Sequence, residues 1–267
     1  MKPAVFVRET DDRRAFTREA MKRFSGEWAG RKVFVKPNVV SYERYPTTTH
    51  PDVLREVLRA LTSRDCEVIV GDGPAFNAGN STRIIENHHL QQVCGEFDIE
   101  LCNLHEEPFR KVMTRTGYKL RVSSVPFGYQ YLISLPVLKY HPVTTVTGAL
   151  KNHFGFLQNR ERLLMHARLK SIHRSIAELH NVFKASLVIM DGARTMRMAN
   201  ELRHGGKAMR LGYMFAGQDP VALDCAGFNL LRNVLPELEG QEPEKVEHIR
   251  QAIRLGIGKP DYRRLAL

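Results

Sequence analysis

The sequence lacks any closely spaced pair of cysteines. Its four cysteines, Cys66, Cys94, Cys102 and Cys225, stand singly along the 267 residues. A zinc ribbon and a cysteine-ligated iron–sulfur cluster both need paired ligands, so neither is expected. We therefore expect free, buried thiols and no iron–sulfur cluster ligated by this chain.

Long apolar runs are also missing. No stretch approaches the roughly 18 apolar residues that a membrane-spanning helix needs. The first residues, MKPAVFVRETDD, enter a predicted strand without the layout of a signal peptide. These two features predict a protein with no membrane partner and a cytoplasmic location.

Basic residues are in excess, but they form no single block. The 40 Lys and Arg residues outnumber the 29 Asp and Glu residues and give a formal net charge of +11. Such an excess favours anionic partners, whether a small phosphate or carboxylate, an acidic protein or a nucleic acid. Nucleic acid is the least favoured, because no basic run interleaved with aromatic residues is present.

Apolar strand-like segments alternate with amphipathic helical ones along the whole chain. Strands are expected at 3–7, 33–36, 67–71, 99–104, 131–138, 186–190 and 213–217, with a hairpin over 109–125. Helices are expected at 15–24, 51–61, after Ser81, and at 161–183, 220–231 and 244–255. This alternation predicts an α/β fold in which a mostly parallel central sheet has helices on both faces, in three layers. We expect one domain over residues 1–267.

Polar side chains directly follow many of the predicted strands. Ligands of parallel sheets bind beyond the carboxyl ends of the strands, so these side chains are expected to converge on one site. In chain order they are Lys36, Asn38, Asp72, Lys139, His141, Asp191 and Asp219. The three carboxylates, Asp72, Asp191 and Asp219, are candidate ligands of a divalent metal or would orient a base.

The stretch 134–157, SLPVLKYHPVTTVTGALKNHFGFL, is the least ordinary part of the sequence. Its Lys139, His141, Lys151 and His153 stand beside strongly apolar neighbours, where an unpartnered cation or imidazole is costly to bury. They are either surface lysines with capping imidazoles or a site in which lysines hold an anion and an imidazole moves a proton or binds a metal. Small neighbouring residues leave room for a ligand, which favours a site. His141, His153 and Lys151 are the candidate catalytic residues.

Other segments allow two interpretations each. The loop GDGPAFNAG at 71–79 matches neither a dinucleotide fingerprint nor a P-loop, and is a tight turn or part of a ligand site. Thr49 and His50 either begin a helix or offer groups to an anion. The basic segment 193–210 is a solvated loop or a flap over the ligand, and the flap would contribute Arg194, Arg197 or Lys207.

Three histidines recur every seven residues on the predicted helix 161–183. They are His166, His173 and His180. Seven residues correspond to roughly 10 Å of helix, too far for two of them to share one metal. Only His166 is expected to approach the site.

Many of these segments occur together in one known family. They are KPN at 36–38, THPDVLREV at 49–57, GDGP at 71–74, LPVLKYH at 135–141, TGALKNHFGF at 147–156, His166, the Asp191 segment and AGQDPVALD at 216–224. In them the chain resembles the uncharacterised bacterial and archaeal family catalogued as domain of unknown function 362. The resemblance implies a single α/β domain with a site built from these segments. The candidate ligand-binding residues are Lys36, Asn38, Thr49, His50, Lys139, Thr147 and Asn152.

Partners and cofactors follow less directly from this resemblance. Many members of the family carry an appended ferredoxin-like segment with two cysteine clusters, which is not found in this sequence. After Asp191 the chain has ELRHGGK where a turn containing Gly-Pro is expected. A fainter likeness in organisation to the nickel-dependent lactate racemases, whose sites use lysine and histidine, is an analogy of fold and implies no nickel.

The leading hypothesis is an enzyme of unspecified reaction that binds a small anionic substrate or cofactor at the carboxyl edge of its sheet, with or without a divalent metal. Positive charge would come from Lys36, Lys139 and Lys151. The alternative is a non-catalytic, redox-associated accessory protein that works with a ferredoxin-type partner. A nucleic-acid binder ranks third.

Overall fold

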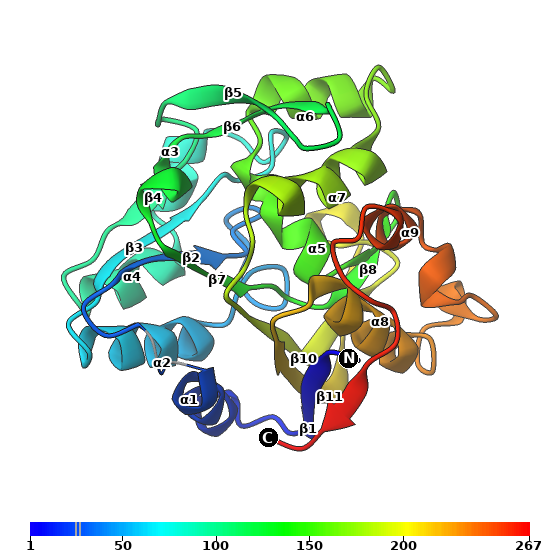
Figure 1. Cartoon of the computed structure of the whole chain (residues 1–267), viewed down its shortest axis with the longest axis horizontal. Helices are drawn as coiled ribbons and strands as arrows, with labels where there is room; N and C mark the ends of the chain where they lie inside the picture. The colour runs from blue at the N-terminus through cyan, green and yellow to red at the C-terminus, as the bar shows by residue number, and fades with distance from the viewer. Residues whose placement is uncertain (25, 27) are drawn as a thin grey trace.

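The centre of the fold is one large sheet. The computed structural model describes residues 1–24, 26 and 28–267, and within these residues eight strands pair in the order β12-β1-β11-β10-β7-β2-β3-β4 (Figure 1). Their bounds are β1 Ala4–Glu9, β2 Lys32–Pro37, β3 Glu67–Asp72, β4 Leu101–Asn103, β7 Tyr131–Leu135, β10 Leu187–Arg197, β11 Lys207–Gly217 and β12 Arg263–Leu265.

Strand direction confirms the predicted α/β class. All neighbouring strands run parallel except β11, which is antiparallel to both β1 and β10. The carboxyl ends of β2, β3, β7 and β10 therefore share one edge of the sheet. The carboxyl end of β11 lies at the opposite edge, where Gly217 pairs with Val188 at the start of β10.

Helices cover both faces of the sheet. In Figure 1, α1, α2 and α4 lie on one side, and α5, α7, α8 and α9 lie on the other. The bounds are α1 Arg13–Phe24, α2 Pro51–Thr62, α3 Ser81–Glu86, α4 His89–Gly95, α5 Ala149–Asn152, α6 Asn159–His166, α7 Ile172–Val182, α8 Pro220–Leu231 and α9 Glu247–Arg254. Short 3-10 turns are η1 Val125–Gly128, η2 His153–Phe156, η3 Leu202–His204, η4 Pro236–Leu238 and η5 Pro243–Lys245.

The strand β2 shows why two layers of helices are needed. Val33 and Val35 are fully buried in the core beneath α1 and α2, whereas Phe34 is fully buried in the core on the other face. Successive side chains of a strand point to opposite faces, so an apolar run such as VFV must be covered twice.

Two small hairpins accompany the main sheet. The predicted hairpin around Gly117 is present as β5 Phe109–Met113 and β6 Lys119–Ser123. A second, unpredicted one joins β8 Lys139–His141 to β9 Thr145–Thr147. The second hairpin lies within the stretch singled out in the sequence.

The helix predicted over 161–183 is interrupted, so that prediction is wrong in its middle. The chain turns between α6 and α7, where Arg168 has a left-handed φ of 58°. The side chain of Ser171 then accepts a hydrogen bond from the backbone N–H of Arg174 at 3.2 Å and begins α7. The apolar spacing continued across this break because both helices pack on the same core.

Half of the basic segment 193–210 is regular strand. The strands β10 and β11 continue as a hairpin as far as Arg197 and Lys207, with a bulge between Gly192 and Arg194. The residues at its tip include η3 and fold back toward the loop that follows β2, as the hydrogen bonds described below show.

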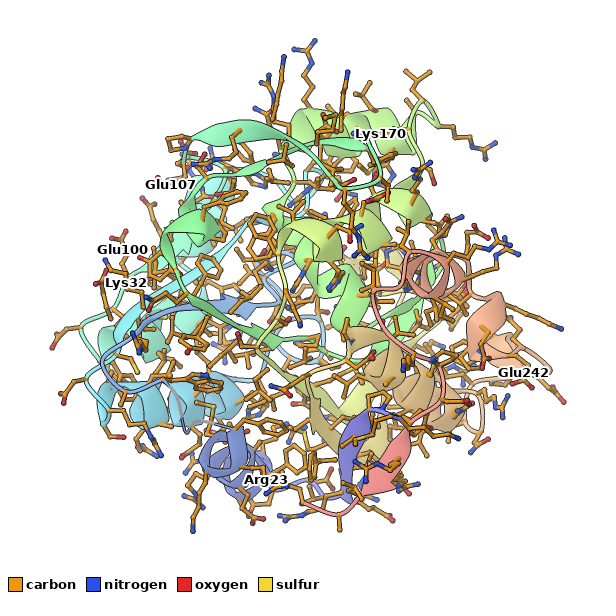
Figure 2. All side chains as sticks on the ribbon, viewed as in Figure 1. Arg23, Lys32, Glu100, Glu107, Lys170 and Glu242 are labelled. Carbon is orange, nitrogen blue, oxygen red and sulfur yellow. The ribbon has the colours of Figure 1, made fainter. Side chains whose placement is uncertain are left out.

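The cysteines are free thiols, and charged side chains lie at the surface (Figure 2). All four cysteines are free, with Cys94 and Cys225 buried and Cys66 and Cys102 half-buried, so the expectation of buried thiols holds for two of them. Figure 2 shows charged side chains around the outline of the molecule, among them Arg23, Lys32, Glu100, Glu107, Lys170 and Glu242. None of the helices in the described ranges is long and apolar enough to cross a membrane.

Candidate functional site

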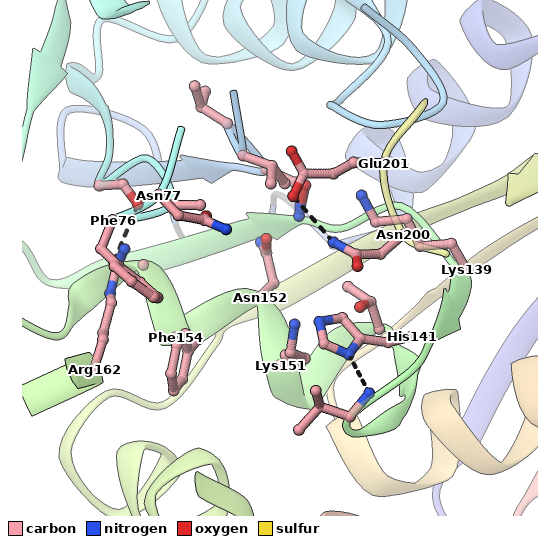
Figure 3. Close-up of a pocket in the computed structure, with 18 of the residues that line it drawn as sticks. Phe76, Asn77, Lys139, His141, Lys151, Asn152, Phe154, Arg162, Asn200 and Glu201 are labelled. Atoms are coloured by element: carbon pink, nitrogen blue, oxygen red, sulfur yellow. Dashed lines mark hydrogen bonds between the residues drawn. The ribbon is translucent and has the colours of Figure 1, made fainter. Parts of the chain in front are cut away.

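A cavity of about 230 Å³ lies beyond the carboxyl ends of β2 and β3. Its walls come from the loops after these strands, the β8–β9 hairpin with α5, the helix α6 and the tip of the β10–β11 hairpin (Figure 3). The predicted site residues that line it are Asn38, Asp72, Lys139, His141, Thr147, Lys151 and Asn152, and His166 joins them.

The β8–β9 hairpin explains why several of these side chains share one wall. Lys139 and His141 are two residues apart on a strand, so they point to the same face. Thr147 pairs directly opposite Lys139 and therefore joins them. A short hairpin thus delivers an ammonium, an imidazole and a hydroxyl to the cavity.

Lys139 is buried, and no carboxylate of the described residues pairs with it. Its side chain is 1% exposed, and Nζ donates to the backbone carbonyl of Thr47. Burial lowers the pKa of Lys139 to about 8, although the charges of Glu201 and Glu43 oppose this change. Near neutral pH the cavity therefore holds an ammonium that is only partly compensated.

Lys151 is less compensated still. It projects from α5 into the cavity, and among the described residues no hydrogen bond or ion pair engages its Nζ. Burial, followed by the positive charge of Lys139, lowers the pKa of Lys151 to about 7. At neutral pH a large fraction of this side chain is thus the free amine.

The ring of His141 is held as a hydrogen-bond donor. Its Nδ1 accepts from the backbone N–H groups of Val143 and Thr144 at 3.1 and 3.2 Å, so the neutral ring carries its proton on Nε2. Burial and then the charges of Lys151 and Lys139 lower the pKa of His141 well below its ordinary value. His141 is therefore arranged to polarise a ligand oxygen, and not to accept a proton as a base.

The short helix α5 depends on a carboxylate from α8. Asp224 accepts from the N–H groups of Ala149 and Leu150 at 2.6 and 3.0 Å. A side chain at Gly148 would collide with this carboxylate, so only glycine fits there. Burial raises the pKa of Asp224 to about 7. Asp224 positions Lys151 and was missed in the sequence, where it appears only as the last residue of DPVALD.

An ion pair forms the floor behind the cavity. Lys36 Nζ lies 2.5 Å from Asp72, which also accepts from the N–H groups of Val39 and Gly73 at 2.6 Å each. Lys36 is fully buried and does not line the cavity. The structure therefore places Lys36 behind the cavity, with its ammonium engaged by Asp72, and not among the residues that line it.

Four cavity-lining side chains have buried polar atoms without partners among the described residues. They are Asn38 Oδ1, Thr147 Oγ1, Asn152 Oδ1 and Arg162 Nε. The amide nitrogen of Asn152 is used, since it donates to the Lys36 carbonyl and to Ser134 Oγ at 3.1 and 2.9 Å. Buried polar atoms are normally satisfied, so these atoms indicate that the cavity is shaped for a polar molecule.

The remaining charges of the cavity were not foreseen. Glu201, from the hairpin tip, binds Arg203 at 2.7 Å and accepts from Asn200. Arg162, from α6, donates to the carbonyls of Pro74 and Gly73 at 2.6 and 3.0 Å and holds the GDGP loop. Burial lowers the pKa of Arg162 to about 10. Neither residue follows a strand directly, which is why strand-end reasoning passed over both.

The hairpin tip is fastened over the cavity by Glu43. Its carboxylate accepts from the N–H groups of Leu202 and Arg203 at 2.8 and 2.7 Å. The residues predicted to act from this segment, Arg194, Arg197 and Lys207, do not line the cavity. Their place is taken by Asn200, Glu201 and His204.

Besides Lys36, Asp191 and Asp219, three predicted site residues lie away from the cavity. His153 is fully buried in the core and stacks on His180 at 4.1 Å. Thr49 accepts from the N–H of Asn38 and donates to the Leu135 carbonyl, which fixes the loop after β2. His50 begins α2 by accepting from the N–H of Asp52 at 3.2 Å. All three are placed as structural residues.

The candidate metal ligands do not come together. Asp72 pairs with Lys36, and Asp191 accepts from Arg13 and Tyr45 at 2.7 and 2.9 Å. Asp219 lies at the opposite edge of the sheet because β11 runs antiparallel, and there it caps α8. In the described part of the chain no three His, Cys, Asp or Glu side chains are grouped as metal ligands. The predicted convergence of the three carboxylates is wrong, and this donor set does not fit a metal.

Comparison with known proteins places this geometry in context. The family model described as "Domain of unknown function (DUF362)" matches residues 33–229, which contain every segment of the cavity. A curated relative, the thylakoid-associated protein sll1697 of Synechocystis sp., is 25% identical over 222 residues, covering 80% of this chain and 68% of its own.

Two solved structures are similar in outline. The lactate racemase apoprotein of Thermoanaerobacterium thermosaccharolyticum has a TM-score of 0.49 at 13% identity, and a protein of Thermotoga maritima has a TM-score of 0.41 at 12% identity. The matches cover 80% and 91% of this chain. The chain spans 54% and 58% of the length of these two proteins.

The role of Asp224 can be tested by replacing Asp224 with Ala. At about pH 6, below the raised pKa of Asp224, little free energy is lost by ionising the buried carboxyl, so Asp224→Ala mainly leaves the N–H groups of Ala149 and Leu150 without acceptors and should lower the free energy of unfolding by about 1 to 3 kcal/mol. Urea denaturation measures this. The control Asp261→Ala, in an exposed pair with Lys2, should change stability by less than about 0.5 kcal/mol. Equal effects would contradict the capping role.

The structural role of Asp191 predicts a second stability loss. Asp191→Ala leaves the nearly buried Arg13 without its carboxylate, which should cost about 3 kcal/mol of unfolding free energy. Thermal unfolding with and without EDTA separates this role from metal binding. A wild-type melting temperature that falls with EDTA, together with an Asp191→Ala variant insensitive to it, would show that Asp191 is a metal ligand.

Proposed function

This chain belongs to the DUF362 family, and on that premise we propose that its cavity binds a small anionic molecule as the active site of an enzyme. One observation carries the proposal: two lysines, Lys139 and Lys151, share a cavity of about 230 Å³, and neither is paired with a carboxylate of the described residues.

The energetics of this arrangement support a ligand. Burying two ammonium groups near each other costs free energy, which an isolated fold would avoid. An anion between them would recover it, and the donor Nε2–H of His141 would add a hydrogen bond. Glu201 does not act as the counterion of the two lysines, since Arg203 and Asn200 already engage its carboxylate.

The proposal that the site is catalytic rests on the protonation state of its lysines. A site that only bound an anion would keep its lysines fully charged at neutral pH. In this cavity burial lowers the pKa of Lys151, so that the side chain is partly the neutral amine. The Nε2–H of His141 provides a hydrogen-bond donor in the same cavity. Lowered lysine pKa values and a convergent donor are characteristic of catalytic sites.

Anion binding should weaken as the pH rises. An anion binds the charged lysines, so at about pH 6 binding should take up no proton, whereas from about pH 7 to 9 it should take up protons and lose affinity, by up to tenfold per unit for each proton. Calorimetry with sulfate and oxalate in buffers of different ionisation enthalpy measures both quantities. An affinity independent of pH in this range would contradict the proposal.

Besides Lys139, the ionisable groups around Lys151 are Arg162, Glu201, His141, His166, His204 and His248, with Asp224 at the start of α5. The pKa of Arg162 is lowered only to about 10, and the pKa values of His141, His166 and His248 are lowered, mainly by burial. Burial raises the pKa of Asp224 to about 7, so this carboxyl adds to proton exchange at the lower end of the window. Toward pH 8 and 9 the expected proton uptake is that of Lys139 and Lys151.

Removing one lysine should separate binding from folding. Lys139→Met or Lys151→Met should weaken oxalate binding on the order of ten- to a hundredfold, by loss of a charge-assisted hydrogen bond. Stability should stay equal or rise, because each variant removes a buried or half-buried cation that has no carboxylate partner among the described residues. The control Lys207→Met removes the same charge from an exposed position outside the cavity and should bind normally. Unchanged oxalate affinity in both cavity variants would overturn the proposal.

A further inference from the structure

The amine of Lys151 is placed for covalent chemistry as well as for binding. It stands in the cavity between the wall of the β8–β9 hairpin and Asn152, and no acceptor among the described residues engages it (Figure 3). A lysine that serves only as a countercharge is normally hydrogen-bonded to what it neutralises. Lys139, which does donate to a backbone carbonyl, fits that description better.

The surroundings of Lys151 favour the neutral, nucleophilic form. Burial is the main cause of the lowered pKa of Lys151, and the positive charges of Lys139 and Arg162 add to it. A desolvated lysine next to other cations is a recurrent way of preparing an amine that attacks carbonyl compounds. The opposing charge of Glu201 is held by Arg203 at 2.7 Å.

The groups that would accompany such an attack are on the same wall. His141 presents Nε2–H because both backbone donors of the turn hold its Nδ1, so it can hydrogen-bond a carbonyl oxygen on which negative charge develops. Lys139 projects from the same face of the same strand and can hold an anionic group of the same molecule.

We propose that Lys151 forms a reversible imine with a small aldehyde or ketone that also carries a carboxylate or phosphate. This proposal rests on the anion site described above and names the class of its substrate. Lys139 holds the anionic group, His141 donates to the carbonyl oxygen, and Lys151 attacks the carbonyl carbon.

The step balances without any oxidant or metal. The nitrogen lone pair forms the C–N bond while the carbonyl π electrons move to oxygen, and one hydrogen passes from nitrogen to that oxygen. The C–O bond then breaks, the oxygen leaves as water with the second hydrogen of the amine, and the C=N bond forms. The products are one imine and one water.

Reductive trapping tests the proposal on the intact chain. The protein is incubated with cyanoborohydride and glyoxylate, or with glycolaldehyde phosphate, and the modified lysines are identified by peptide mass spectrometry. At about pH 7 Lys151 should be labelled on the order of a hundredfold faster than exposed lysines such as Lys245, because far more of it is neutral. Neutral glycolaldehyde, which lacks the anionic group, should keep the preference that comes from the neutral amine but should label Lys151 more slowly than either anionic aldehyde.

Two variants control the labelling. Lys151→Arg keeps the charge but has no attacking amine, and should abolish the fast labelling, whereas Lys245→Arg should leave it unchanged. Labelling spread over exposed lysines, or fast labelling that persists in Lys151→Arg, would overturn the proposal. Peptide mapping of the labelled wild-type protein still tests the proposal if a variant fails to fold.

Failure of this inference is distinguishable from failure of the anion site. Sulfate binding that follows the expected pH dependence, together with no preferential labelling of Lys151, would overturn the imine and leave the anion site standing. Loss of both would overturn both. If glyoxylate labels Lys151 faster than glycolaldehyde phosphate does, the anionic group of the substrate is assigned as a carboxylate. The reverse order would assign it as a phosphate.

Discussion

The buried ion pair between Lys36 and Asp72 is the interaction on which the site depends. It joins the carboxyl ends of β2 and β3 at 2.5 Å, and the segment that carries Lys151 is seated against it. A side chain at Gly155 would collide with both partners, so the glycine lets η2 pass directly over the pair. The amide of Asn152 then binds the Lys36 carbonyl and Ser134. Removing either charge would leave the other buried alone.

This pairing sets the charge balance of the cavity. Lys36 and Asp72 neutralise each other, Glu201 is engaged by Arg203, and Asp191 is engaged by Arg13 and Tyr45. Each nearby carboxylate is thus committed to another partner. Lys139 and Lys151 are left with excess positive charge in a poorly solvated space, a cost in stability that sites for charged ligands commonly carry.

Much of the fold could be predicted from the sequence, because strand and helix signals are local. The strands that end at Pro37, Asp72 and Leu135 were placed to within a few residues, and with them the edge where the cavity lies. Strand direction is not local. Nothing in 213–217 reveals that β11 returns antiparallel, so Asp219 was assigned to the wrong edge. His153 was misplaced for a similar reason, because its contact with His180 depends on how α7 packs.

Asp224 shows most clearly why part of the site could not be predicted. In DPVALD the first carboxylate, Asp219, caps α8 itself, accepting from Ala222 at 2.9 Å. The second, Asp224, lies within α8 and caps a different helix, α5, which precedes it by about 75 residues in sequence. Helix α8 thereby links the edge of the sheet opposite the cavity to the helix that carries Lys151. The segments GALKN and DPVALD thus contact each other because the second carries the carboxylate that caps the short helix of the first. Position 148 needs a glycine because this carboxylate lies against it.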